Sequence, residues 1–440
     1  MSRGVLIWWR AVAAAGLLLF AVSPAAGVDR FPKPEFQSGY ELPVEDQPPA
    51  RAGWIQVLDV AVLAAALGAA AWLVLRKRSR SGVLLLTVFA VLYFGFWRRG
   101  CVCPVGATQN VAVALFDGGA SIPWVVIVFF LLPLLAALLF GRVFCAAVCP
   151  LGAIQDLVAL RPRPVPDWIA AVLGLFPYLF LGGAVYLAVM GAGYIVCRYD
   201  PFVALFRLSG PFALLVLGAL MLGIGVFYAR PYCRFVCPYA VLLGWLSRFA
   251  RRHATITPDE CINCRLCEEA CPFGAIRKPT PQGPPEERAR GVRRIALLLV
   301  LLPLLAGAGG WAVAAAHMPI SRAHPAVRLL DRLQAENAGA VEGTTIESDA
   351  FRETGRTREE LRREVANIQD RFRRGAWWLG GFLGLVVGGQ LLGLSVHRTR
   401  DDYTIDNARC LSCARCFSYC PRHRLRYGGG PRREEKAAEA

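Results

Sequence analysis

Charged residues are scarce in this sequence, and acidic residues are scarcer than basic ones. Charged side chains make up 18% of the 440 residues against 55% hydrophobic ones, and 32 acidic residues face 49 basic ones. Because the apolar residues gather in long runs, the composition excludes an ordinary soluble protein and predicts a polytopic membrane protein. Most Lys and Arg stand in short blocks beside these runs, as the positive-inside rule describes. We therefore expect a lipid bilayer as partner and no nucleic acid.

Histidine is also scarce, with five in the whole chain. No two histidines stand four residues apart within an apolar run, so the pattern gives no support to a pair of haem ligands. Surface or interfacial positions are the simpler interpretation. The five are His253, His317, His324 and His397 near expected membrane boundaries, and His423 after the last cysteine motif.

Cysteine is plentiful and patterned, and the chain is organised around two copies of one cysteine motif. The spacing is Cys-x2-Cys-x2-Cys-x3-Cys-Pro, and the copies end at Pro272 and Pro421. This is the ligand spacing of bacterial ferredoxins, in which three thiolates of one copy bind one cubane and the fourth binds the other. A zinc ribbon or a set of disulfides is the alternative, but zinc knuckles usually lack the third equally spaced cysteine.

Two copies of the motif predict two 4Fe–4S clusters with crossed ligation. Each cluster is expected on three cysteines of one copy and the fourth cysteine of the other. The expected sets are Cys261, Cys264 and Cys267 with Cys420, and Cys410, Cys413 and Cys416 with Cys271.

The order of apolar and polar segments predicts the domain organisation. Residues 1–27 have the basic start, apolar core and small residues of a signal peptide, with an uncleaved anchor as the alternative. The further segments expected are a periplasmic linker (28–53), a five-span membrane domain (54–250), a first ferredoxin half (251–285), a membrane hairpin (286–400) with a periplasmic helical insert (317–374), a second ferredoxin half (401–427) and a disordered tail (428–440).

Seven apolar runs after the N-terminal segment are each predicted to cross the membrane. They are about Trp54–Leu75, Val83–Trp97, Ile122–Phe140, Trp168–Met190, Pro211–Tyr228, Ile295–Ala316 and Trp377–Val396. Starting outside, five crossings leave the first ferredoxin half in the cytoplasm, and the last two return the chain to that side. The expected fold is mainly α: a polytopic transmembrane helical bundle with a split bacterial-type 2×(4Fe–4S) ferredoxin domain on the cytoplasmic face.

The segment between the last two spans is charged and helix-forming. Thr357 and Glu360 have the spacing of a capping box, in which a hydroxyl and a carboxylate satisfy free backbone donors at a helix start. Leu361, Val365 and Phe372 then follow at helical spacing, together with Ile368. We interpret the insert as a small amphipathic hairpin that packs on its neighbours or on a partner.

Three further stretches resemble one another and bring cysteines to the ends of expected spans. They begin near Arg99, Arg142 and Arg230, and the last two share Cys-x3-Cys-Pro. Residues i and i+4 lie on one side of a helical turn, so each Cys-x3-Cys can supply two thiolates to one metal centre. Parity places both pairs on the inner face, where they can form a third iron–sulfur site; buried thiols without metal are the alternative. The four residues are Cys145, Cys149, Cys233 and Cys237.

Three cysteines remain, and the same parity places them on the outer side. They are Cys101, Cys103 and Cys197. One hypothesis is an outer redox relay, through a metal or a reversible disulfide, that joins the inner clusters to a periplasmic partner. The alternative is a structural disulfide from Cys197 to Cys101 or Cys103, which leaves one buried thiol.

In combination, the ferredoxin motifs, the Cys-x3-Cys-Pro motifs and the polytopic frame resemble the NosR/NapH type of membrane iron–sulfur proteins, from about Trp54 to Pro421. The resemblance implies that the cysteines of both motif types are ligands. It also implies electron transfer between a cytoplasmic donor or the quinone pool and a membrane or periplasmic acceptor, in the bacterial inner membrane. No catalytic residue is expected, although an oxidoreductase subunit is one interpretation. The alternative function is a redox-sensing regulatory or metallocentre-assembly factor, including a metal reductase.

Overall fold

The computed structural model describes residues 53–423 except for 101, 117–121, 161, 257–260, 281–286, 397–399 and 401. The segments expected as signal peptide or anchor (1–27) and as tail (428–440), and the linker up to residue 52, lie outside the described residues. The elements up to the first cysteine motif are α2 (Gly53–Leu75), α3 (Arg80–Ala90), the π-helical turn η1 (Val91–Trp97), α4 (Pro104–Phe116), α5 (Trp124–Phe140), the π-helical turn η2 (Phe144–Val148), α6 (Pro150–Val158), α7 (Asp167–Leu173), α8 (Phe176–Val189), α9 (Ile195–Tyr199), α10 (Pro201–Arg207), α11 (Phe212–Phe227), α12 (Pro231–Phe235) and α13 (Tyr239–Ser247).

From the first ferredoxin motif onward, the chain forms two long helices, α15 and α19, and several shorter elements. They are α14 (Leu266–Glu269), β1 (Ile276–Arg277), α15 (Arg288–Ala315), α16 (His317–Ser321), α17 (Pro325–Asn337), α18 (Ile346–Glu353), α19 (Arg358–Ser395), β2 (Thr404–Ile405) and α20 (Arg415–Tyr419). The chain is therefore mainly helical, with several apolar helices.

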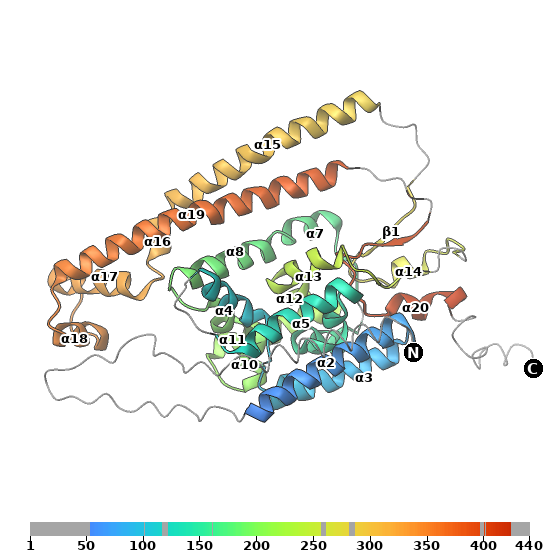
Figure 1. Ribbon diagram of the computed structural model, residues 1–440, viewed down its shortest axis with the longest axis horizontal. Helices are drawn as coiled ribbons and strands as arrows, with labels where there is room; N and C mark the ends of the chain where they lie inside the picture. The colour runs from blue at the N-terminus through green and yellow to red at the C-terminus, as the bar shows by residue number, and fades with distance from the viewer. Residues whose placement is uncertain are drawn as a thin grey trace, which may run out of the picture.

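The elements that carry the two ferredoxin motifs lie together at one end of the molecule. Figure 1 shows β1, α14 and α20 at this end, while α16, α17 and α18 lie at the opposite end. The long helices α15 and α19 connect the two ends. The helical insert and the ferredoxin motifs are thus separated by the length of these helices.

Among the residues that the structure describes, five helices are long and apolar enough to cross a membrane, which is consistent with a multi-pass membrane protein. They are Gly53–Leu75, Arg80–Trp97, Trp168–Val189, Arg288–Ala315 and Arg358–Ser395.

Two of the seven predicted spans are shorter than these five. α5 has 17 residues and ends at Phe140, as predicted, because the φ of 74° at Gly141 takes the chain out of the helix. α11 has 16 residues and reaches spanning length only together with α10, from which it is bent by 106°. The described residues therefore contain five candidate spans, or six if the bent pair of α10 and α11 counts as one span. The sequence predicted seven, because a run of apolar residues does not show where a helix is bent.

The predicted capping box is present in the helical insert, but no break separates the last helix of the insert from the apolar segment that follows it. The Thr357–Glu360 capping box starts α19, and this helix continues without a break to Ser395. Leu361, Val365 and Phe372 are buried, the first two against α17 and α18.

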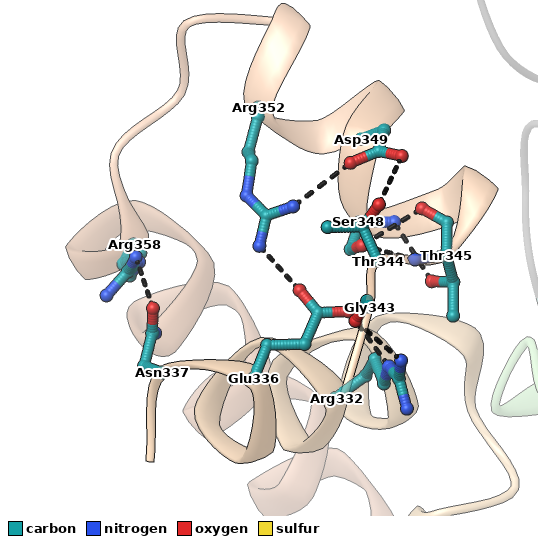
Figure 2. Close-up of polar contacts among 10 residues, drawn as sticks. All are labelled: Arg332, Glu336, Asn337, Gly343, Thr344, Thr345, Ser348, Asp349, Arg352 and Arg358. Atoms are coloured by element: carbon teal, nitrogen blue, oxygen red, sulfur yellow. Dashed lines mark hydrogen bonds and ion pairs between the residues drawn. The ribbon is translucent and has the colours of Figure 1, made fainter. Parts of the chain in front are cut away.

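One ion pair joins α17 to α18 at the far end of the molecule. Figure 2 shows Glu336 of α17 between Arg332, at 2.8 Å, and Arg352 of α18. Thr345 and Ser348 form a second capping box at the start of α18. This second box was not predicted from the sequence.

The helices α15 and α19 approach closely along a stripe of glycines. Gly380, Gly384 and Gly388 repeat every four residues, so they lie on one side of α19. A Cβ at Gly380 would overlap the carbonyl of Gly309, and one at Gly384 would overlap the carbonyl of Leu305. Small residues at this spacing let two apolar helices meet at backbone distance, where van der Waals contact stabilises the pair.

Replacing Gly384 with valine is therefore expected to destabilise the hairpin of α15 and α19 by about 1–3 kcal/mol, because the new side chain has no space beside Leu305. The measurement is the free energy of unfolding in detergent. Gly389→Val is the matched control, since a Cβ at Gly389 meets nothing within 4 Å. Equal effects of the two substitutions would show that helix propensity, and not close packing, explains the loss.

The two ferredoxin halves are joined by a short antiparallel sheet. Ile276 of β1 pairs with Ile405 of β2, and Arg277 pairs with Thr404. Arg277 also forms an ion pair with Asp406 at 2.6 Å. These contacts place both halves side by side although the helices from α15 to α19 separate them in the chain.

Candidate metal centres

The two ferredoxin motifs bend their backbones at equivalent positions. Asn263 and Arg265 in the first motif, and Ser412 and Ala414 in the second, have φ values of 52, 63, 53 and 61°. Residues other than glycine seldom adopt this left-handed conformation, and such strain persists mainly at functional sites. The two copies of the motif thus have the same local geometry.

The first cavity at this end of the molecule is lined by cysteines from both halves. Its volume, with the open mouth included, is about 370 Å³. Ile256, Ile262 and Tyr403 are among its walls. The lining cysteines are Cys261, Cys264 and Cys267 from the first motif and Cys420 from the second. The structure thus brings together the four thiols that the spacing assigns to one cluster.

A second cavity has the complementary composition. Its volume is about 400 Å³, and its apolar walls include Phe273, Ile405 and Phe417. The lining cysteines are Cys410, Cys413 and Cys416 from the second motif and Cys271 from the first. Each half therefore contributes one cysteine to the cavity of the other half.

Burial makes these thiols hard to ionise on their own. Burial, together with the neighbouring thiols of Cys261 and Cys264, raises the pKa of Cys267 to about 11. Burial also raises the pKa of Cys410 to about 12. Because cysteine binds metals as the thiolate, a bound cation must supply the attraction that keeps these groups charged.

The thiols fit an iron–sulfur cluster better than a single ion. Among the described residues, no three or more His, Cys, Asp or Glu side chains are arranged around one metal-ion position. A zinc knuckle would need that arrangement, with four ligands directed at one ion. A cubane instead offers a separate iron to each thiolate, so four thiols spread around one cavity suit it.

The Cys-x3-Cys-Pro motifs form a second group of thiols inside the largest hydrophobic core. Cys149 interacts electrostatically with Cys145, Cys233 and Cys237. All four residues are 7% exposed. Cys149 directly precedes α6, Cys145 lies in η2 and Cys233 lies in α12, so short helical turns position the thiols. The structure therefore brings these four cysteines together as well.

Two polar side chains donate hydrogen bonds to sulfur in this group. Gln155 Nε2 lies 3.4 Å from the sulfur of Cys233, and Arg142 Nη2 lies 3.9 Å from that of Cys145. Hydrogen bonds to ligand sulfur and burial are the main means by which a protein tunes a cluster potential.

A buried carboxylate connects this thiol group to the second ferredoxin half. Asp156 is fully buried and forms ion pairs with Arg80 at 2.7 Å, Arg230 at 3.3 Å and Arg415 at 3.6 Å. Arg80 also donates a hydrogen bond of 3.0 Å to the carbonyl of Cys413. This network was not predicted from the sequence. In the sequence, Asp156 stands at the end of the stretch that begins near Arg142, and nothing there indicates which arginines surround it.

The remaining thiols are only partly described. Cys101 lies outside the described residues. Cys103 and Cys197 are close, because a Cβ at Gly106 would lie 2.8 Å from the sulfur of Cys197 and the thiol of Cys103 interacts with Cys197. No disulfide joins Cys103 to Cys197.

Comparison with known families shows that the chain contains 4Fe–4S binding domains. One family model, described as a 4Fe-4S binding domain, matches residues 122–166 and 209–257. A second model with the same description matches residues 254–277. The first match includes Cys145 and Cys233, and the second includes Cys261 and Cys271.

Two curated proteins resemble parts of the chain. The "Uncharacterized protein MJ0749" of Methanocaldococcus jannaschii is 37% identical over 67 residues, which cover 15% of this chain and 27% of that protein. The "Putative electron transport protein YccM" of Escherichia coli is 26% identical over 118 residues, which cover 24% of this chain and 33% of that protein. The matches thus span about a quarter to a third of these relatives. No solved structure matches the chain significantly.

Proposed function

We propose that this protein transfers electrons in the bacterial inner membrane, between a cytoplasmic donor or the quinone pool and a membrane or periplasmic acceptor. The observation that carries the proposal is the succession of thiol groups. The side chain of Arg230 interacts electrostatically with Cys413 of the second ferredoxin half and with Cys145 and Cys233 of the Cys-x3-Cys-Pro group. One side chain thus lies within range of two candidate cluster sites, one in the ferredoxin domain and one within the apolar core.

In this proposal the cysteines of each cavity hold one 4Fe–4S cluster, with the crossed ligation given above, and the Cys-x3-Cys-Pro thiols hold a third. Bound clusters supply one-electron redox chemistry. The chain supplies the thiolates, an apolar surrounding, and the hydrogen bonds of Gln155 and Arg142 to sulfur. Its partial likeness to the "Putative electron transport protein YccM" of Escherichia coli supports the same class of activity.

The distribution of basic residues supports a cytoplasmic position for the ferredoxin end. Arg76, Lys77 and Arg78 follow α2, and Arg78 lies over the ring of Phe417 with 5.0 Å to its centroid. The positive-inside rule places such blocks on the cytoplasmic side. In this orientation the insert of α16–α18 is periplasmic, and the N-terminal segment has the role of a signal peptide or anchor.

Replacing Cys149 and Cys237 together with alanine is expected to remove about four irons per chain, the content of one cubane. It is also expected to abolish most electron flux in liposomes. The measurements are the iron content of protein prepared without oxygen, and the transfer of electrons from an impermeant reduced ferredoxin to a quinone analogue. The EPR signals of the ferredoxin-domain clusters serve as the folding control.

Two results would contradict this proposal in different ways. An unchanged iron content in the double variant would show that the Cys-x3-Cys-Pro thiols carry no cluster. Full iron in the unmodified protein, with no flux to any quinone analogue, would favour the regulatory or assembly role instead.

A further inference from the structure

We infer that Cys103, Cys197 and Asp200 form an additional iron–sulfur site, with the carboxylate of Asp200 as a ligand in the position that a cysteine occupies in the four-thiol group. The inference deepens the proposed function and rests on it for the kind of cofactor. The site itself is separate from the four thiols of the Cys-x3-Cys-Pro group.

The same structural pattern surrounds the proposed site and the four thiols of the Cys-x3-Cys-Pro group. Cys103 and Cys149 each precede a proline that starts a helix, α4 and α6 respectively. The glycine three residues after each cysteine faces another thiol: a Cβ at Gly106 would lie 2.8 Å from the sulfur of Cys197, and one at Gly152 would lie 3.4 Å from that of Cys233. Cys197 and Cys233 are therefore equivalent positions.

A second pair of contacts has the same pattern. Gln109 and Gln155 each stand six residues after the cysteine that precedes the proline. Gln109 Oε1 accepts a hydrogen bond of 3.0 Å from the amide of Val196, and Gln155 Oε1 accepts one of 3.0 Å from the amide of Tyr232. Both amides belong to the residue directly before a cysteine of the pair defined above.

The repeat makes Asp200 the counterpart of Cys237. Cys197 and Cys233 are both the third residue of a five-residue helix, α9 and α12. The residue before the next proline is Asp200 in the first case and Cys237 in the second. One residue fewer separates the members of the first pair, which hides the equivalence in the sequence. The thiol of Cys103 interacts electrostatically with both Asp200 and Cys197.

The charge of Asp200 provides an independent argument. Asp200 is 3% exposed, and its carboxylate accepts hydrogen bonds from the amides of Phe202 and Val203 and from the hydroxyl of Tyr232. Within the part of the chain that the structure describes, no Lys or Arg forms an ion pair with it, whereas Asp59 and Asp156 have arginine partners. A buried carboxylate is normally paired with a cation or bound to a metal.

The chemical class of the ligand follows from the arrangement of these side chains. Two thiols and a carboxylate stand at positions equivalent to three of the four thiols that are proposed to hold a cluster, so the same kind of cofactor suits them. The site also lies beside the four-thiol group, because Cys237 interacts electrostatically with Cys103, and the hydroxyl of Tyr232, the residue directly before Cys233, donates a hydrogen bond to Asp200. A cluster here would extend the succession of sites by one.

The test compares variants of the full-length protein prepared without oxygen. Cys103→Ala/Cys197→Ala is expected to lower the iron content per chain, and Asp200→Asn is expected to lower it at the same site or to change the EPR signal of one cluster. Asparagine caps a helix about as well as aspartate, so Asp200→Asn keeps the capping role and removes the charged ligand. Asp200→Cys is expected to retain the iron, with a shifted EPR signal for one cluster.

Unchanged iron content and EPR signals in both the Asp200→Asn variant and the cysteine double variant would overturn the inference, and Asp200 would then be a helix cap only. The ferredoxin-domain signals show whether each variant is folded. Loss of iron in these variants in a protein that carries no electron flux would contradict the proposed function but leave this site in place.

Discussion

Replacing Cys267 with alanine is expected to remove one ferredoxin-domain cluster, and replacing Cys420 is expected to remove the same one. The two residues stand in different motif copies, but they line one cavity. Each single variant should lose about four irons per chain, and the double variant should lose no more, because one cluster has both as ligands. The iron content and the EPR spectrum of the reduced protein are the measurements.

Cys271→Ala is the matched control for this experiment. It stands in the same motif as Cys267 but lines the other cavity. It should therefore remove the other cluster, and Cys271→Ala combined with Cys267→Ala should remove about eight irons. If the Cys267 and Cys420 variants lost different clusters, the crossed ligation would be wrong and each motif would hold its own cubane.

Asp156→Asn is expected to lower the free energy of unfolding by about 3–5 kcal/mol, the usual effect of breaking a buried ion pair from one side. Asparagine preserves the size of the side chain but leaves the guanidinium groups of Arg80, Arg230 and Arg415 without their shared carboxylate. Arg230 is fully buried, so solvent cannot replace the lost charge. The measurement is unfolding in detergent, followed by the absorbance of the clusters.

Asp370→Asn is the control for this substitution. Asp370 also pairs with two arginines, Arg373 at 2.8 Å and Arg374 at 3.2 Å, but these side chains are solvent-exposed. Exposed ion pairs contribute about 0–1 kcal/mol. Similar small effects of both substitutions would show that the Asp156 network does not stabilise the contact with the second ferredoxin half.

The features that depend on neighbouring residues could be predicted from the sequence. The spacing of Cys261 to Pro272 defines a tight ligand loop, and the 4Fe–4S binding domain is confirmed for that stretch. The capping box of Thr357 and the buried face of Leu361 were also predicted and confirmed. These features are local, because a turn or a helix start is decided by side chains within a few residues of one another.

The lengths of the helices were less predictable. Two apolar runs, Ile122–Phe140 and Pro211–Tyr228, were each predicted to form a full span. The structure has helices of 17 and 16 residues there, α5 over Trp124–Phe140 and α11 over Phe212–Phe227, and α11 is bent from α10 by 106°. Hydropathy measures the preference of each residue for an apolar surrounding, and it does not measure the backbone conformation at a break.

The contacts between distant segments were decided only by the tertiary structure. The glycine at position 384 is visible in the sequence, but the carbonyl of Leu305 that needs the space is not. Nothing near Asp156 in the sequence indicates its arginine partners, and nothing near Asp200 indicates its equivalence to Cys237. Such relations depend on which helices pack together, and packing is selected by the whole chain, because each buried charge and each close approach must be satisfied by a segment far away in the sequence.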